Sequence, residues 1–478
     1  MSLLGLELSD AGIMVASMPH GQLLELEGAH RESPGFIVAE PSRLRAGKTA
    51  ERQAHRQPGA VANAFWDQLN TEPVRQAGLE GLNNSELAHG HLQSIWEAVR
   101  PYGDDMVMAV PEFFTREQLG LLLGIAQELA IPVSGLAALS VAASTSPCPR
   151  DLLVHLDMHL HRSVVTVLEQ GERLVARQTE SLPGQGLDRL YAEWVKAIAD
   201  EFVRRTRFDP FYQAASEQEL YDRLPEVFAA LHASPAVGFE IKAELQTHRI
   251  DLRRDLLLQK GAPVFLEICR LVESMREKHG QPGQILRLQV SHRAARLPGL
   301  TETLARIPHV RPIELPPGAG AAGVLRLRDQ FAGPRNHRGV SFLTSRPWRP
   351  APDAAPAPRV RSDIRPTHVL YRSLAYPISD QPLVVGRDDA AGVPIDGRAQ
   401  AVSRNHCTIQ LRGRDVLLVA ESAHGTYVDE IRVAQTAVLR LGQVIRVGTP
   451  GETLQLIACV DRAQSAIAAP TMKKQAKT

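Results

Sequence analysis

The chain has 478 residues, of which 44% are hydrophobic and 22% are charged, an ordinary balance for a soluble globular protein. Domains usually hold about 100–200 residues, so this length predicts two to four of them. The 54 lysines and arginines nearly balance the 53 acidic residues and leave a formal net charge of +1. That balance argues against nucleic acid or an anionic membrane as the main partner, because both are bound through excess positive charge.

No stretch of the sequence predicts a targeting or membrane-spanning segment. Residues 1–18 lack a basic start, and Glu7 and Asp10 interrupt their apolar run. No run of about 18 uncharged apolar residues occurs elsewhere. The four cysteines form no CxxC pair, which predicts neither a disulfide framework nor a cysteine zinc site. We therefore expect a cytoplasmic protein without membrane insertion.

The first 330 residues alternate strand-like and helix-like segments. Helices are predicted at 118–129 and 187–203, where apolar residues recur at helical spacing. Short buried strands are predicted at 3–8, 106–110, 152–156, 163–168 and 285–290. Strands separated by helices indicate an α/β architecture for residues 1–330.

A segment rich in proline and arginine divides the chain. Residues 331–366 show no apolar periodicity and are predicted to form an extended linker. Residues 367–461 form a second domain and residues 462–478 a disordered tail. Short strands are predicted in the second domain at 383–385, 407–411, 416–419, 426–428, 444–447 and 454–459. Their close spacing, with glycine, aspartate and proline between them, is typical of an all-β sandwich.

Three short motifs follow one another in the second domain. They are Gly386-Arg387, then Ser403-Arg404-Asn405-His406, and then the stretch from Ser422 to Asp429. A guanidinium fork matches the oxygens of a phosphate ester, and a nearby hydroxyl adds a hydrogen-bond donor. In order and spacing the motifs resemble the forkhead-associated (FHA) domain, over roughly residues 367–460.

The resemblance implies a phosphothreonine-binding site on loops at one end of the sandwich. It assigns Arg387 and Ser403 to the phosphate, and Arg404 to the phosphate or the peptide. The usual asparagine that holds the peptide backbone is His424 here, which is either a binding residue or a plain surface residue. Ala423 is matched to the usual hydroxyl residue, and the loss of that contact would cost about 0.5–1.5 kcal/mol.

Three more positions receive structural roles from the resemblance. Gly386 ends a strand, His406 braces the binding loop, and Gly425 forms a tight turn. The alternative for the whole site is that Arg387 and Arg404 are solvated arginines in a sandwich that binds no phosphate.

Several stretches of residues 1–330 resemble, in order, the ATPase domain of DnaK-type heat-shock chaperones, within the actin-like superfamily. They begin at Gly5, Gly47, Ala109, Gly184, Ile285 and Gly318. The resemblance implies a two-lobed actin-like ATPase fold.

The positions that would hold nucleotide depart from that family. Phosphate loops are rich in glycine, because backbone N–H groups must approach the ligand with no Cβ in the way. Here Glu7 stands for the usual aspartate of the first loop, and Ser9 and Asp10 replace its Gly-Thr pair. The second loop carries His155 and Asp157 and has no glycine. Asp10 would also place negative charge against a phosphate.

Two further positions lack the family's residues. The adenosine block has Val290-Ser291 in place of a glycine pair, and the helix start that carries a catalytic Glu-Pro reads Ser134-Gly135-Leu136. All these positions change while the hydrophobic frame stays recognisable, so we expect a pseudo-ATPase that has kept the fold and lost hydrolysis. This interpretation implies no catalytic residue, no cofactor and no enzymatic activity.

Residues 155–161 also have a pattern that could suggest a metal site. His155, Asp157, His159 and His161 alternate with apolar residues and would share one face of a strand. Imidazole and carboxylate groups can ligate zinc. However, neighbours on one face of a strand lie about 7 Å apart, which is too far for three of them to share one ion. We therefore expect a polar strand face and no metal.

These observations favour a non-enzymatic adaptor. A degenerate ATPase fold would serve as a platform, and the FHA-like module would dock on phosphothreonine of a partner protein, such as a component of a Ser/Thr kinase pathway. One alternative is an active chaperone-like ATPase regulated by its FHA module. The other is a structural platform whose module binds partners without phosphate.

Overall fold

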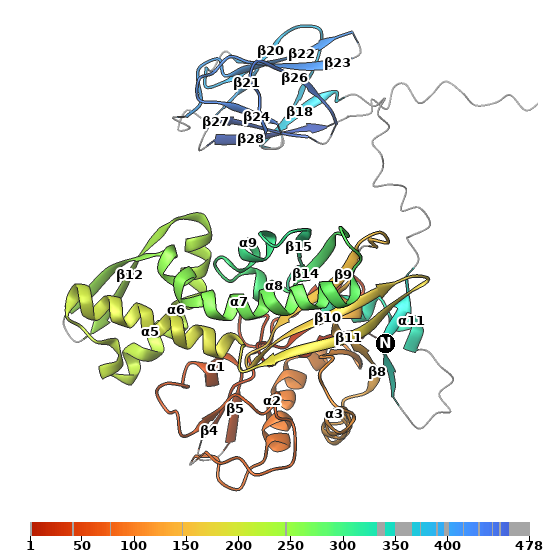
Figure 1. Ribbon diagram of the computed structural model, residues 1–478, viewed down its shortest axis with the longest axis vertical. Helices are drawn as coiled ribbons and strands as arrows, with labels where there is room; N and C mark the ends of the chain where they lie inside the picture. Colours follow the sequence, from red (N-terminus) through yellow and green to blue (C-terminus); the bar gives the residue numbers. More distant parts are fainter. Residues whose placement is uncertain are drawn as a thin grey trace, which may run out of the picture. The chain divides into compact units, whose positions relative to one another are not determined.

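The chain forms two compact units, Met1–Pro350 and Ala351–Thr478 (Figure 1). The computed structural model describes residues 2–40, 43–76, 78–145, 147–243, 246–331, 340–348, 366–372, 374–388, 391–395, 401–413, 415–428, 431–441, 443–448 and 451–457. The predicted tail, and most of the predicted linker, lie outside these residues.

The first unit contains a six-stranded sheet in the order β16-β8-β7-β1-β2-β3. Strands β1, β2 and β3 form an antiparallel meander, and β7, β8 and β16 extend the sheet in parallel from β1. The bounds are β1 Leu3–Glu7, β2 Met14–Ser17, β3 Gln22–Leu23, β7 Asp105–Val110, β8 Val133–Ala138 and β16 Ser341–Leu343.

A second six-stranded sheet repeats this plan in the order β15-β14-β9-β10-β11-β17. Strands β9, β10 and β11 form the meander, and β14 and β15 add in parallel beside β9. The bounds are β9 Leu152–Met158, β10 Arg162–Gln170, β11 Arg173–Pro183, β14 Leu286–Val290, β15 Val310–Glu314 and β17 Ser345–Pro347. The unit therefore has two halves, which we call the first and second half after their sheets.

Helices cover both faces of the first sheet, which is why its strands are apolar on both sides. On β7, Met106 and Met108 face the core shared with α2 (Asn84–Val99) and α3 (Arg116–Glu128). Val107 and Ala109 point the other way, toward α4 (Leu139–Ala143) and α10 (Ala319–Leu325). Capping boxes start α2 and α3, in which a side chain bonds the N3 amide while the N3 side chain bonds back.

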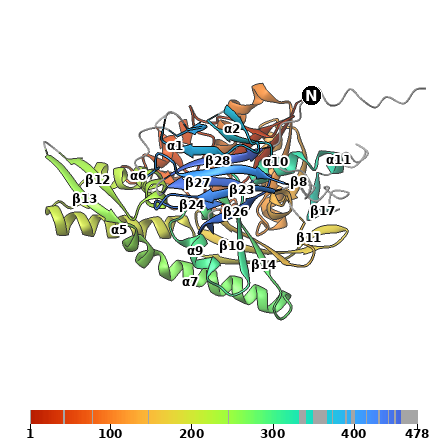
Figure 2. The same ribbon diagram turned by 90° about the horizontal axis from the view of Figure 1, so that it is seen from above.

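The second half adds a helical part to its sheet. Helices α5 (Leu187–Thr206) and α6 (Ala214–Ala233) lie beside the hairpin of β12 (Ala236–Ala243) and β13 (Gln246–Arg253), as Figures 1 and 2 show. Helix α7 (Arg254–His279) packs on α5 and on the sheet. The apolar stripe predicted at 187–203 is core, because Trp194 is fully buried and its indole N–H donates to the carbonyl of Leu257 at 2.8 Å.

The remaining elements of the first unit are short. They are α1 (Lys48–Glu51), α8 (His292–Ala295), α9 (Leu300–Ala305), α11 (Arg328–Phe331), two single 3₁₀ turns at Arg100–Tyr102 and Pro210–Tyr212, and a small sheet of β4 (Ile37–Glu40), β5 (Arg43–Ala46) and β6 (Val61–Ala62). The predicted strands, the two predicted helices and the α/β architecture are confirmed. None of the helices in the described part of the chain is long and apolar enough to span a membrane.

Two sequence predictions in this unit are wrong. Residues 341–347 were assigned to the linker, but β16 pairs with β8 and β17 pairs with β11 at the edges of the two sheets. Edge strands of three residues are held by backbone hydrogen bonds and need no apolar periodicity. Ser134-Gly135-Leu136 lies within β8, and the following helix α4 begins at Leu139.

The second unit is a β-sandwich, as predicted. One sheet has the order β19-β18-β28-β27-β24-β25 and the other β21-β20-β22-β23-β26. Alternate residues such as Val385, Ile409, Leu418, Ile445 and Leu456 fill the core between the sheets. The bounds are β18 His368–Tyr371, β19 Leu374–Pro377, β20 Leu383–Gly386, β21 Val393–Pro394, β22 Cys407–Arg412, β23 Asp415–Ala420, β24 Thr426–Val428, β25 Ile431–Arg432, β26 Thr436–Leu439, β27 Val444–Gly448 and β28 Gly451–Ile457.

Candidate functional site

The first two sequence motifs meet at one end of the sandwich. Strand β20 ends at Gly386, and the loop before β22 carries Ser403 and Arg404. The amide of Arg387 donates to the carbonyl of Ser403 at 3.0 Å, and the amide of Asp388 donates to the carbonyl of Arg404 at 3.3 Å. These bonds hold the two loops side by side, although the motifs are separated in the sequence.

The buried His406, in the second motif, ties that motif to the third. Its Nδ1 accepts from the amide of Ser403 at 3.2 Å, and its Nε2 donates to the carbonyl of Gly425 at 2.9 Å. This pattern requires a neutral ring with its proton on Nε2. Burial lowers the pKa of His406, which favours that neutral form. The ring therefore braces the loops and does not face a ligand.

Two glycines allow the loops to approach so closely. A Cβ on Gly386 would lie 1.8 Å from the carbonyl oxygen of Arg404, so a side chain there would push the second loop away. Gly425 has a φ of 86°, a left-handed conformation that favours glycine.

The third loop corrects the sequence analysis at Ala423. The hydroxyl expected there is supplied by Ser422, whose Oγ lies 2.7 Å from the Oγ of Ser403. Ser422 Oγ also accepts from the amide of His424 at 3.2 Å. The hydroxyl therefore is not lost, since it stands one residue earlier. The spacing could have shown this, because the family's Ser or Thr stands two residues before its asparagine position, which is His424 here.

Three exposed basic side chains lie on the same loops as the two hydroxyls. Arg387, Arg404 and His424 are all solvent-exposed. Within the described residues, neither the Arg387 nor the Arg404 guanidinium has a hydrogen bond or ion pair with another side chain. The loops thus combine two available cations with two serine hydroxyls, a donor set that suits an anion with several oxygens.

The predicted degenerate nucleotide site lies where the two halves of the first unit meet. Ser9 and Asp10 follow β1, whereas His155 and Asp157 lie on β9. All four are buried, as is Glu7. Ser9 lies within hydrogen-bond distance of His159, and one carboxylate oxygen of Asp10 accepts from the amide of Leu160. Within the described part of the chain, both ring nitrogens of His155, both carboxylate oxygens of Asp157 and the other oxygen of Asp10 are buried without a hydrogen-bond partner. The described residues hold no group of three His, Cys, Asp or Glu arranged to bind a metal ion.

Sequence reasoning missed two residues of this site. One is Glu32, and the other is Arg293, the second residue of α8. The Arg293 side chain is fully buried, and its Nε donates to Glu32 and its Nη1 to Glu7, both at 2.9 Å. Its remaining nitrogen donates to the carbonyl of Gly12. Arg293 stands two residues after Ser291, a position where the family has glycine. An arginine so near an expected ligand position was the signal in the sequence that could have pointed to it.

Little space remains beside the predicted nucleotide residues. The cavity lined by Glu7, His155, Asp157, Ser291 and Gly320 has a volume of about 10 Å³. Ligand pockets commonly have about 300–1,000 Å³, so this cavity holds no more than a water-sized molecule.

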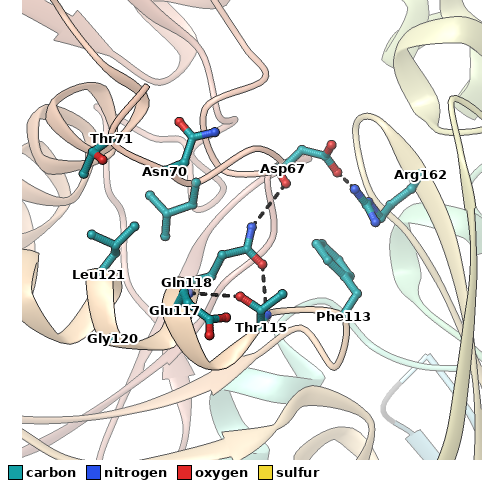
Figure 3. Close-up of a pocket in the computed structure, with 11 residues that line it drawn as sticks. Asp67, Asn70, Thr71, Phe113, Thr115, Glu117, Gln118, Gly120, Leu121 and Arg162 are labelled. Carbon is teal, nitrogen blue, oxygen red and sulfur yellow. Dashed lines mark hydrogen bonds and ion pairs between the residues drawn. The ribbon is translucent and has the colours of Figure 1, made fainter. Parts of the chain in front are cut away.

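A larger concavity of about 790 Å³ lies between α3 and the loop that contains Asp67 (Figure 3). Arg162 forms an ion pair with Asp67 and lies over the ring of Phe113, 4.3 Å from its centre. The Gln118 amide points toward the carbonyl of Asp67. None of the residues predicted from the sequence to form a site lines this concavity.

Comparison with known families agrees with the geometry of the second unit. Residues 383–448 match the family model of the FHA domain, a range that contains all three motifs. The second unit therefore contains an FHA domain. No family match accompanies the resemblance of the first unit to DnaK-type chaperones. A comparison with curated proteins finds no match for the chain.

Proposed function

We propose that the protein is a cytoplasmic adaptor that docks on phosphothreonine of a partner protein through its FHA domain, for example in a Ser/Thr kinase pathway. The observation that carries this proposal is that the loops of the three motifs come together, with the hydroxyls of Ser403 and Ser422 2.7 Å apart and the exposed guanidinium groups of Arg387 and Arg404 on the same loops.

Each group has a chemical role in the proposal. A phosphate ester carries nearly two negative charges and three acceptor oxygens at neutral pH. Arg387 and Arg404 neutralise that charge, and the hydroxyls of Ser403 and Ser422 donate to phosphate oxygens. His424 holds the peptide by donating from its ring to a backbone carbonyl. His406 stays buried and keeps the loops in place.

Binding of the full-length chain to a phosphothreonine peptide library, measured by fluorescence anisotropy, tests the proposal. A charge-assisted hydrogen bond contributes about 1.5–3 kcal/mol, so Arg387→Ala should weaken binding by about 10- to 150-fold. Arg440→Ala is the matched control, because this exposed arginine follows β26 at the opposite end of the sandwich and should leave affinity unchanged. Equal binding of phosphorylated and unphosphorylated peptides would refute the proposal and favour a phosphate-independent module.

For the first unit we propose a non-catalytic platform with a two-lobed actin-like fold. The repeated strand plan of its two sheets supports this fold, because each half has a meander with parallel strands added beside its first strand. The small volume of the cavity lined by Glu7, His155 and Asp157 supports the loss of nucleotide binding.

Calorimetric titration of the full-length chain with Mg-ATP tests the platform. No heat of binding and no phosphate release are expected up to millimolar ATP. Saturable binding would restore the alternative of an active ATPase that its FHA domain regulates.

A further inference from the structure

Buried charges cross between the two halves of the first unit. Arg293 of the second half forms hydrogen bonds with three groups of the first half, namely the carboxylates of Glu7 and Glu32 and the carbonyl of Gly12. Each of the three guanidinium nitrogens has an acceptor, and the side chain is inaccessible to solvent. These bonds use three of the five N–H donors of the guanidinium, one on each nitrogen.

A second connection lies on the other side of the cleft. The carboxylate of Asp10, in the first half, accepts from the amide of Leu160 at 2.7 Å. It also lies 3.3 Å from Nδ1 of His159, whose Nε2 is 3.4 Å from Asp157. The hydroxyl of Ser9 is 3.1 Å from the same Nδ1. His159 therefore lies between carboxylates of both halves.

The glycines of the cleft make room for the chain's own carboxylates. A Cβ on Gly12 would lie 2.2 Å from Cγ of Glu32, and one on Gly320 would lie 2.8 Å from a carboxylate oxygen of Glu7. The amide of Gly320 donates to Glu7 at 2.8 Å. The Gly320 amide, a backbone group that could approach a ligand here, is therefore occupied by the Glu7 side chain.

We infer that the first unit is a self-locked clamp, in which Arg293 and the Asp10–Leu160 and Asp10–His159 contacts hold the two halves closed without any ligand. Opening the cleft requires these contacts to break together, and a nucleotide would have to displace the carboxylates of Glu7 and Glu32 from Arg293. The unit consequently presents one fixed surface. This inference concerns the first unit and does not depend on phosphopeptide binding by the second.

The amide of Leu160 gives a direct readout, because its acceptor is the Asp10 side chain of the other half. Hydrogen exchange followed by mass spectrometry would measure it in the full-length chain, in peptides that cover residues 158–164. Exchange should be slower than in an unstructured peptide by about 100-fold or more, and Mg-ATP should not change it. Rapid exchange in the wild-type chain, or a change on adding Mg-ATP, would overturn the clamp.

Variants separate the lock from general stability. Arg293→Met should accelerate exchange at residues 158–164 by about tenfold or more, whereas Arg177→Met should not, because Arg177 forms an exposed pair with Glu169. Glu32→Gln keeps the shape of the side chain and removes one charge. It should increase the exchange rate less than Arg293→Met does, and it tests the lock if Arg293→Met does not fold. Unchanged exchange in both Arg293→Met and Glu32→Gln would refute the lock. The phosphopeptide affinity of these variants should be unchanged. A failure of the lock can then be distinguished from a failure of phosphopeptide binding by the second unit.

Discussion

Replacing His406 by alanine should disconnect the three binding loops of the FHA domain. The variant removes the acceptor of the Ser403 amide and one of two donors to the carbonyl of Gly425. The amide of Gly448 still donates to that carbonyl at 3.0 Å, so the carbonyl keeps a partner. The main penalty therefore falls on the amide of Ser403.

The size of the effect follows from these two bonds. An amide left without an acceptor costs about 1–3 kcal/mol, and the lost bond to Gly425 adds about 1 kcal/mol. Because Ser403 is only half-buried, we expect a decrease of about 2–3 kcal/mol in the free energy of unfolding of the FHA domain. With a urea m-value near 1–2 kcal/mol per molar, the midpoint falls by about 1–3 M.

Urea unfolding of the full-length chain can report this separately for each unit. All four tryptophans, Trp66, Trp96, Trp194 and Trp348, belong to the first unit. Tryptophan fluorescence should therefore show an unchanged transition, while circular dichroism of β-structure shows an earlier second transition. Phosphopeptide affinity should fall as well, since the loop of Ser403 is no longer fixed.

His368→Ala is the control within the same domain. Within the described residues, the side chain of this histidine, on β18, forms one hydrogen bond, with the hydroxyl of its neighbour Thr367, and it is half-buried. Its loss should change the unfolding free energy by about 0.5 kcal/mol or less. Equal effects of His406→Ala and His368→Ala would refute the bracing role of His406.

Further predictions concern the first unit, with tryptophan fluorescence during urea unfolding as the measurement. Burial lowers the pKa of His91 to about 3, so the unfolded state binds the proton more readily than the folded state. The free energy of unfolding should therefore fall as the pH drops below about 6.5, and His91→Gln should flatten that decline. Burial disfavours the charged form of His159, but the neighbouring carboxylates outweigh burial and raise its pKa. The stability that charged His159 contributes to the folded unit is therefore complete below about pH 6.5 and should be lost as the pH rises through the raised pKa. A Cβ on Gly323 would lie 1.9 Å from the carbonyl of Ala142, so Gly323→Ala should destabilise the unit by about 1–3 kcal/mol. Gly124, on the exposed face of α3, has open space around it, and Gly124→Ala should stabilise by about 0.5–1 kcal/mol; shifts of the same sign for the two glycines would contradict the packing argument.

Much of the FHA domain could be predicted from the sequence. Its strands alternate inward and outward residues, and its three motifs carry the residue types that suit phosphate. Both signals are local, because periodicity and motif spacing extend over only a few residues. The hydroxyl of Ser422 was misassigned to Ala423, and the contact of its Oγ with Ser403 corrected this.

In the first unit the sequence determined the alternation of strands and helices, the replacement of the first loop's Gly-Thr pair by Ser9 and Asp10, and the absence of glycine from the second loop. Only the tertiary structure decided what fills the cleft. Arg293 pairs with Glu7 and Glu32 across 286 and 261 residues of chain, a pairing that no local pattern encodes. The same holds for β16 and β17, since sheet edges bond a short segment through its backbone, whatever its side chains. Local chemistry is written in neighbouring residues, whereas the partners of a buried charge are decided by how the whole chain packs.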